Sequence, residues 1–255
     1  MIKLTQLLLE VVGKPKAIFL AGPAGSGKSY ITKQILPSAF TTINVDDTYE
    51  ELLKASGLGL KQKDFTSDQL SQAAKLMGQA QKATKEKLAQ SSTEGKNLII
   101  DGTGAASKPL LKKKEELEAL GYECMMVMIY VSPVTSLQRN AGRDRSLMPS
   151  IVLRTWRDVN QNINVYKQEF GDNFILINND PKDATKGFSP ELIKSFFQDA
   201  KAKGKPKTPE EQAKSKAERE KLNADIEALV KEIPDFDTLE SSLTNEFIYF
   251  RFSAF

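Results

Sequence analysis

Eight consecutive residues, Gly22 to Ser29, have the types and spacing of a loop that binds phosphate. They satisfy the pattern G-x-x-x-x-G-K-[ST] at every fixed position and lie between an apolar stretch and a predicted helix. The glycines allow main-chain N–H groups to turn toward phosphate oxygens, and the helix N-terminus adds partial positive charge. We expect Lys28 to reach the β- and γ-phosphates of ATP or GTP, and the Ser29 hydroxyl to bind Mg²⁺.

Three acidic residues follow predicted strands and are candidates for chemistry on a second substrate. Asp46 and Asp47 follow the strand predicted over residues 41–45, and Asp101 ends the strand predicted over 97–100. The carboxyl ends of parallel strands form the ligand crevice of such sheets. Phosphoryl transfer to a hydroxyl requires a carboxylate that orients it and accepts its proton. We expect Asp46 to be this base and Asp47 to cap the next helix. Asp101 either binds Mg²⁺ or contacts the acceptor, and the sequence leaves both roles open.

The stretch LQRNAGRDRSLMP contains arginines that are suited to a transferring phosphate. Arg139 and Arg143 are four residues apart and share one face if they are helical. Guanidinium groups that close over the γ-phosphate lower the barrier to its transfer. The alternative is a solvated arginine cluster, which is common on protein surfaces. The expected nucleotide contacts are Gly22, Ala24, Gly25, Ser26, Gly27, Lys28, Ser29 and Arg139. The expected catalytic residues are Asp46, Lys28, Arg139 and Arg143, and the expected acceptor contacts are Asp46, Asp101 and Thr103.

The elements that must position these residues alternate between apolar strands and amphipathic helices. This pattern predicts βαβ units in a parallel sheet of about five strands with flanking helices, and together with the phosphate-loop motif it predicts an α/β P-loop NTPase fold. The predicted strands are 17–20, 41–45, 97–100, 122–131 and 174–177. The predicted helices are 28–36, 67–90 with Ser67 as its cap, 109–120, 133–140 and 150–170.

The composition changes near residue 180, which divides the chain into a kinase-like domain over 1–180 and an extension over 181–255. The extension is predicted to hold a helix at 190–202, a lysine- and proline-rich linker at 201–211, a charged helix at 213–232 and an aromatic tail at 247–255. Either the apolar stripe of the charged helix and the tail fold back onto the domain, or they bind a protein partner in a larger assembly.

The composition excludes several classes of site. The chain has no histidine and one cysteine, Cys124, so histidine bases, an internal disulfide and multi-cysteine zinc sites are excluded. The net charge of +3 permits an anionic substrate without indicating a nucleic-acid binder. No apolar run has the length of a membrane span, so we expect no membrane partner and a cytoplasmic location. The first residues read as a short helix rather than a signal peptide.

From about Lys16 to Asn179 the chain resembles the P-loop kinases related to zeta toxins and to phage polynucleotide kinase. FTTINVDDTY resembles the polynucleotide kinase segment whose first aspartate activates the 5′-hydroxyl, which implies that role for Asp46. TSLQRNAGRDRSLMPSIVLRTW resembles that family's lid, whose paired arginines match Arg139 and Arg143. LIIDGTG is similar to the zeta toxin pattern, in which an acidic residue contacts a sugar-nucleotide acceptor, so the resemblance makes Asp101 an acceptor contact.

The chain departs from polynucleotide kinases at two places on the acceptor side. Thr48-Tyr49-Glu50 stands where they carry an arginine, and Gly102-Thr103-Gly104 replaces their Asp-Thr-Asn. The acceptors that remain open are a nucleotide sugar, a nucleic-acid 5′ end and a small metabolite. Many relatives are phage-encoded, which implies a phage origin and a location in the host cytoplasm or virion. The alternative to a kinase is a structural or interaction protein that binds nucleotide without transferring phosphate.

Overall fold

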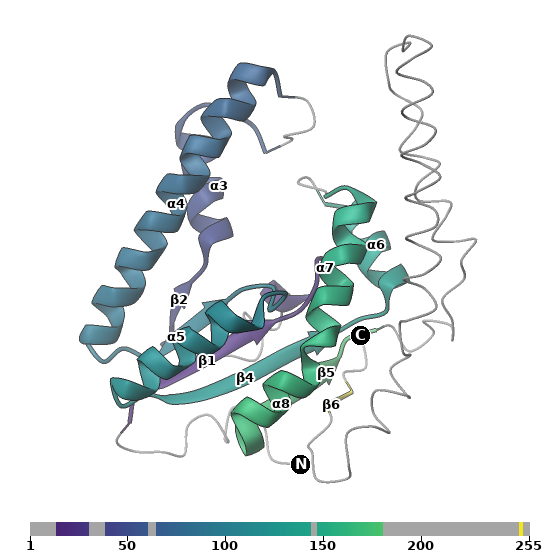
Figure 1. Ribbon diagram of the computed structural model, residues 1–255. Coiled ribbons are helices and arrows are strands. Elements are labelled where there is room, and N and C mark those ends of the chain that lie inside the picture. Colours follow the sequence, from purple (N-terminus) through teal and green to yellow (C-terminus); the bar gives the residue numbers. More distant parts are fainter. Residues whose placement is uncertain (1–13, 31–38, 61–64, 144–146, 181–249, 252–255) are drawn as a thin grey trace.

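The computed structural model describes residues 14–30, 39–60, 65–143, 147–180 and 250–251. Within them, parallel strands form a six-stranded sheet in the order β2-β3-β1-β4-β5-β6 (Figure 1). The strands are β1 Lys16–Ala21, β2 Thr41–Ile43, β3 Leu98–Asp101, β4 Glu123–Tyr130, β5 Phe174–Asn178 and β6 Phe250–Arg251. The predicted P-loop NTPase fold is confirmed. The two-residue strand β6, which pairs with β5, adds to the five strands predicted.

Helices flank this sheet as predicted. Figure 1 shows α5, α7 and α8 in front of one face of the sheet, whereas α3 and α4 pack against each other beyond its β2 edge. The helices are α3 Val45–Ala55, α4 Ser67–Thr93, α5 Ser107–Ala119, α6 Pro133–Ala141, α7 Pro149–Gln161 and α8 Ile163–Phe170, and a 3₁₀ turn, η2, covers Gly171–Asn173.

The central strands are buried on both faces, which explains their continuous apolar sequence. In β1, Phe19 contributes to the large core that also contains Trp156 of α7 and Phe170 of α8. Its neighbours Ile18 and Leu20 belong to a second cluster, because successive side chains of a strand point to opposite faces. The sheet is therefore a rigid support for the loops at its carboxyl edge.

Two details of the predicted helices were wrong. Helix α4 is capped by Thr66 rather than Ser67, and the Thr66 side chain and Gln69 form a capping box. The single helix predicted over 150–170 is divided into α7 and α8 at Asn162. The Asn162 side chain donates hydrogen bonds to the carbonyls of Gly104 and Ala105, at 3.1 and 3.0 Å. This polar contact fixes the loop after β3 at the helix break.

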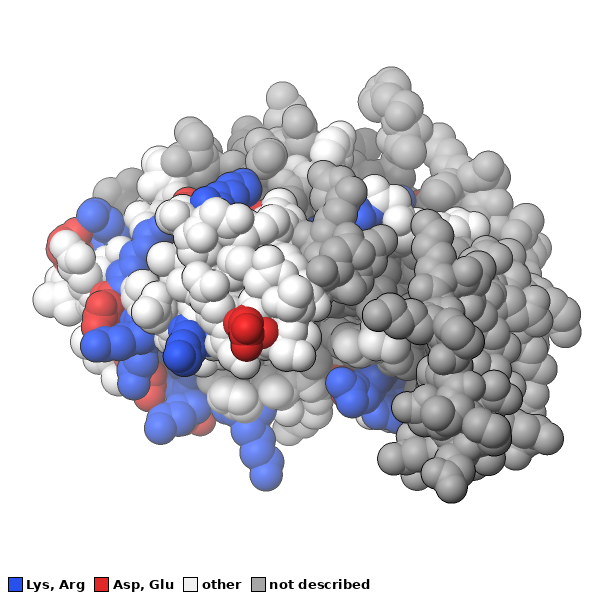
Figure 2. All heavy atoms as spheres, turned by 90° about the horizontal axis from the view of Figure 1, so that it is seen from above, with Lys and Arg blue, Asp and Glu red and all other residues white. Residues whose placement is uncertain are grey.

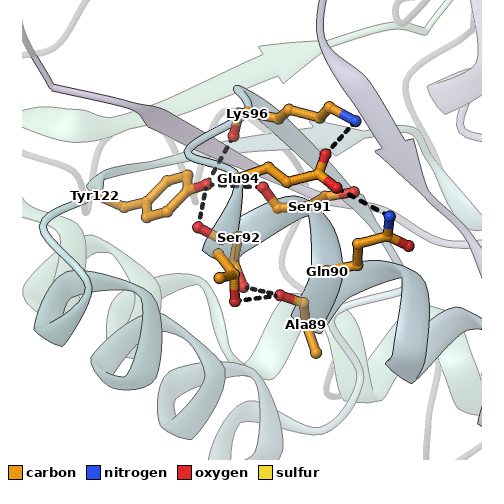
Figure 3. Close-up of polar contacts among 8 residues, drawn as sticks. Ala89, Gln90, Ser91, Ser92, Glu94, Lys96 and Tyr122 are labelled. Carbon is orange, nitrogen blue, oxygen red and sulfur yellow. Dashed lines mark hydrogen bonds and ion pairs between the residues drawn. The ribbon is translucent and has the colours of Figure 1, made fainter.

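The end of α4 is attached to the sheet by Tyr122, which precedes β4. Its hydroxyl points at the carbonyls of Ser91, Ser92 and Lys96, as Figure 3 shows, and donates to the Lys96 carbonyl at 2.8 Å. The same figure shows Glu94 between the side chains of Gln90 and Lys96. These contacts fix the turn between α4 and β3, because the last carbonyls of a helix have no partner within it.

Several predicted elements lie outside the described residues. They are the N-terminal helix, the helix at 28–36 beyond residue 30, and residues 181–249 and 252–255 of the extension. The division of the chain at residue 180 therefore stays a prediction. In the part of the chain that the structure describes, no helix is both long and apolar enough to cross a membrane.

Candidate active site

A cleft of about 760 Å³ opens at the carboxyl edge of the sheet, where the phosphate loop follows β1. All the site residues predicted from the sequence line it except Gly22, whose carbonyl nevertheless contacts the cleft residue Lys28. The strand register explains the convergence, since Leu20 of β1 pairs with Asp101 of β3, and Ile43 of β2 pairs with Ile100. The cleft residues are Pro23, Ala24, Gly25, Ser26, Gly27, Lys28, Ser29, Asn44, Asp46, Asp47, Glu50, Leu60, Asp101, Gly102, Thr103, Arg139, Gly142, Arg143, Leu147 and Thr155.

The glycines of the phosphate loop are required by its backbone. Gly25 and Gly27 have φ angles of +75° and +89°, in the region that favours glycine. A Cβ on Gly25 would lie 2.8 Å from the Ser136 carbonyl oxygen, and one on Gly27 would collide with the Asn179 amide. The loop can therefore present its N–H groups to a phosphate only with glycine at these positions.

Lys28 is half-buried in the cleft and is held by the loop itself. Its Nζ donates to the Gly22 carbonyl at 2.6 Å and to the Pro23 carbonyl at 3.5 Å. Burial lowers the pKa of Lys28, and Arg143 acts in the same direction, whereas Asp101 and Asp46 raise it. A bound phosphate would favour the charged ammonium, because an adjacent negative charge stabilises it.

The outer side of the phosphate loop is held by α6 and by the residues after β5. The Ser136 hydroxyl donates to the Ala24 carbonyl, and the Asn179 amide donates to the Ser26 carbonyl at 2.8 Å. Arg139 bridges the two segments, because its guanidinium donates to the carbonyls of Gly25 at 3.3 Å and Asn179 at 3.0 Å. The carbonyls of Ala24, Gly25 and Ser26 thus each accept a hydrogen bond from a side chain outside the loop, which holds the loop in its shape.

The two predicted arginines have different surroundings. Arg139 is in α6 and binds main-chain carbonyls of the loop, whereas Arg143 follows the end of α6 and is exposed at the cleft. The predicted sharing of one helix face does not apply, since α6 ends at Ala141 and Gly142 is its C-cap. Arg145, in the same sequence stretch, lies outside the described residues.

Asp101 ends β3 deep in the cleft. Its Oδ2 accepts a hydrogen bond from the Asn44 amide at 2.9 Å, while its Oδ1 is buried without a hydrogen-bond partner among the residues that the structure describes. Burial raises the pKa of Asp101; Lys28 opposes this shift, and Asp47 and Asp46 add to it. An unpaired buried carboxylate oxygen is costly unless a cation or donor arrives.

Asp46 and Asp47 lie in the first turn of α3 and are exposed. The prediction that Asp47 caps the helix was wrong, because the N-cap is Asn44, whose Oδ1 accepts from the Asp46 N–H at 2.8 Å. Partial burial raises the pKa of Asp47, and the adjacent Glu50 and Asp46 raise it further. The helix N-terminus favours negative side chains in this turn, which suits the two acidic residues to their place beside the cleft.

The residues predicted to bind Mg²⁺ face the same cleft. The Ser29 hydroxyl and the Asp101 carboxylate are oxygen ligands of the kind that Mg²⁺ prefers, and in the described part of the chain Asp101 Oδ1 has no hydrogen-bond partner. These two residues fit a magnesium ion that is also bound by phosphates. Among the described residues, no group of three or more acidic, cysteine or histidine side chains is placed to hold a metal alone.

Thr103 lies in the loop that follows β3, beside the phosphate loop. Its carbonyl accepts from the Gly22 N–H at 2.9 Å, and its Oγ1 accepts from the Ala105 N–H at 3.3 Å. Gly104 follows with φ +74°, and its carbonyl accepts from the Tyr166 hydroxyl at 2.8 Å. The predicted acceptor contact Thr103 is therefore in a loop that is fixed from both sides.

The sequence-based reasoning missed three polar residues that build the site, namely Asn44, Ser136 and Asn179. Each contacts a predicted site residue or a neighbour of one. Asn44 and Asn179 directly follow strands β2 and β5. Their positions at strand ends could therefore have identified them as site residues from the sequence. Ser136 carried no signal, because a helical serine at that position has many ordinary roles.

Comparison with known proteins finds a family and solved structures to which the chain is similar. The family model described as Zeta toxin matches residues 4–175. The solved complex of AvrRxo1-ORF1 and -ORF2 with ATP shares 16% identity, covers 91% of this chain and 85% of that chain, and has a TM-score of 0.52. A structure from the PezAT toxin-antitoxin system of Streptococcus pneumoniae shares 16% identity over 87% of this chain and 88% of that chain, with a TM-score of 0.46. No curated protein sequence matches the chain.

Proposed function

This chain belongs to the Zeta toxin family, and from that membership we propose that it is an ATP-dependent kinase that transfers the γ-phosphate to a hydroxyl acceptor. A phosphotransferase is the class that the family and the fold support. The observation that carries the proposal is the convergence of Lys28, Asp46 and Asp101 on one cleft at the phosphate loop. Transfer of a phosphoryl group to a hydroxyl requires a nucleotide site and a carboxylate near the acceptor in the same cavity.

On the donor side, we assign nucleotide binding to the main chain of residues 22–29 and to Lys28. When nucleotide binds, the Lys28 ammonium would leave the Gly22 carbonyl and contact phosphate oxygens instead. Their negative charge would stabilise the charged form of Lys28, which burial disfavours. Arg139 would keep the loop in shape through its bonds to Gly25 and Asn179. Arg143, exposed at the opening, would stabilise the negative charge of the transferring group.

On the acceptor side, Asp46 would orient the acceptor hydroxyl and accept its proton. Its place in the first turn of α3 puts the carboxylate at the cleft, within the same cavity as the phosphate loop. Ser29 and Asp101 would hold Mg²⁺, which neutralises phosphate charge when it is bound. Asp101 and Thr103 would also contact the acceptor, because both line the cleft beside Asp46.

A nucleotide sugar, a nucleic-acid 5′ end and a small metabolite are the acceptor classes to be tested. In the described part of the face shown in Figure 2, basic side chains gather along one side with a few acidic side chains among them. All three acceptor classes are anionic or can carry phosphate, so they are tested in one panel. We further propose that the protein is phage-encoded. We also propose that the extension over 181–255 binds a protein partner.

The test is transfer of labelled γ-phosphate from ATP to a panel of nucleotide sugars, nucleosides and 5′-hydroxyl oligonucleotides. Asp46→Asn should lower transfer by about a thousandfold and leave the Kd for ATP within twofold, because it removes only the base. Lys28→Ala should weaken ATP binding itself. The controls are Asp172→Asn and Lys75→Ala, which alter exposed residues that do not line the cleft.

The outcomes separate the proposal from its alternative. Transfer to one acceptor class that is lost in Asp46→Asn supports a kinase and names its substrate. Undiminished transfer by Asp46→Asn would remove that residue from the mechanism. ATP binding without transfer to any acceptor would instead favour a nucleotide-binding structural or interaction protein.

A further inference from the structure

Asn44 contacts both acidic parts of the cleft through one side-chain amide. Its Oδ1 accepts from the main-chain N–H of Asp46 at 2.8 Å, and its Nδ2 donates to Oδ2 of Asp101 at 2.9 Å. An asparagine amide is planar and offers an acceptor and a donor in fixed relation. The two contacts therefore fix the start of α3 relative to the end of β3.

Asn44 is itself held by the sheet and by α4. It follows β2 directly, and the register of Ile43 with Ile100 places it beside Asp101 on the neighbouring strand. Its carbonyl accepts from the Thr48 hydroxyl at 3.1 Å, and the Thr48 oxygen accepts in turn from Thr84 of α4 at 3.3 Å. The Asn44 side chain is half-buried, and these contacts restrict the movement of its backbone.

The contact also distinguishes the two oxygens of Asp101. Because Oδ2 is occupied by Asn44, Oδ1 is the oxygen that is buried without a partner. We propose that Asn44 is a positioning residue of the phosphotransfer site, which fixes the orientation of the Asp101 carboxylate at the cleft and sets Asp46 beside it. This inference rests on the proposed kinase function for its effect on rate, but the contact itself can be tested without activity.

The first test separates the two roles of Asn44 with Asn44→Ser. A serine can cap α3 by accepting from the Asp46 N–H, but it is too short to reach Asp101. We expect kcat to fall about tenfold or more, since small misplacements of reacting groups cost that much, while the Kd for ATP changes less than twofold. The control is Asn97→Ser, which removes the 2.8 Å bond to the Lys16 N–H outside the cleft and should leave kcat unchanged. Wild-type kcat in Asn44→Ser would overturn the proposal.

The second test is a double-variant cycle on Tm, which needs no catalysis. Asn44→Asp keeps the cap of α3 but places a second carboxylate beside that of Asp101, where the two charges repel. We expect Tm to fall by about 3–6 °C. Adding Asp101→Asn restores a donor–acceptor pair with the groups exchanged. It should therefore raise Tm more in the Asn44→Asp background than in the wild type. An equal effect in both backgrounds would show that residues 44 and 101 do not interact. If the wild type transferred no phosphate, the kinase function would be refuted. The Tm cycle would still show whether residues 44 and 101 interact.

Discussion

The two sides of the cleft are built differently. The donor side is a continuous main-chain loop, residues 22–29, whose shape depends on glycine φ angles and on bonds to its carbonyls from Ser136, Arg139 and Asn179. The acceptor side is assembled from side chains at the ends of separate strands, with Asp46 after β2 and Asp101 at the end of β3. A main-chain site tolerates few substitutions and binds one chemical group, whereas a side-chain site can change its substrate residue by residue.

The largest effect that this difference predicts is at Gly27. Gly27→Ala forces a left-handed φ on alanine and brings its Cβ against Asn179, which holds the Ser26 carbonyl. We expect a loss of about 3 kcal/mol or more in ATP binding, which is about a hundredfold in Kd. Isothermal titration calorimetry with ATP and magnesium measures it.

The matched control on the acceptor side is Gly102→Ala. A Cβ at Gly102 meets no heavy atom within 4 Å, so ATP binding should be unchanged even though this glycine lines the same cleft. Equal losses in both variants would show that the two sides do not differ in their tolerance of substitution.

The next effect separates the two arginines. Arg139→Ala removes bonds to the carbonyls of Gly25 and Asn179, and we expect about 2 kcal/mol less stability and weaker ATP binding. Arg143→Ala should leave the stability unchanged and lower kcat about thirtyfold, because it affects only the transferring group. Thermal unfolding and single-turnover transfer measure the two effects.

Arg154→Ala provides the control for both arginines, since Arg154 is exposed on α7 and does not line the cleft. A fall in kcat without loss of stability in Arg139→Ala would mean that this arginine, too, acts on the phosphate. The sequence analysis expected both arginines to be catalytic, and this result would restore that view.

The sequence predicted the phosphate loop and its place at the cleft, because G-x-x-x-x-G-K-[ST] specifies a backbone path. That the loop binds the donor nucleotide stays a prediction. It also predicted Asp46 and Asp101 as cleft residues, since strand ends converge at one edge of a parallel sheet. The sequence did not show that Asn44, rather than Asp47, caps α3, because several residues there are good caps. Nor could it show the break at Asn162, which depends on a bond to a loop about 60 residues earlier in the chain.

The smallest expected effect concerns the support of the acceptor side. Tyr166 donates its hydroxyl to the Gly104 carbonyl at 2.8 Å, and Asn162 donates to the same oxygen at 3.1 Å. Because a second donor remains, Tyr166→Phe should cost only about 1 kcal/mol of stability at neutral pH. ATP binding should not change, since the phosphate loop keeps its own contacts.

The pH dependence of that small effect gives a sharper test. Burial raises the pKa of Tyr166 from 10.0 to about 12, so the folded state holds the phenolic proton more tightly than the unfolded chain does. The stability due to this group is complete below pH 10 and is lost as the pH rises from about 10 through about 12. Urea unfolding should therefore show a smaller loss of stability in Tyr166→Phe than in the wild type over that range. Parallel losses would mean that Tyr166 is not buried as the structure has it and does not help to hold the loop after β3.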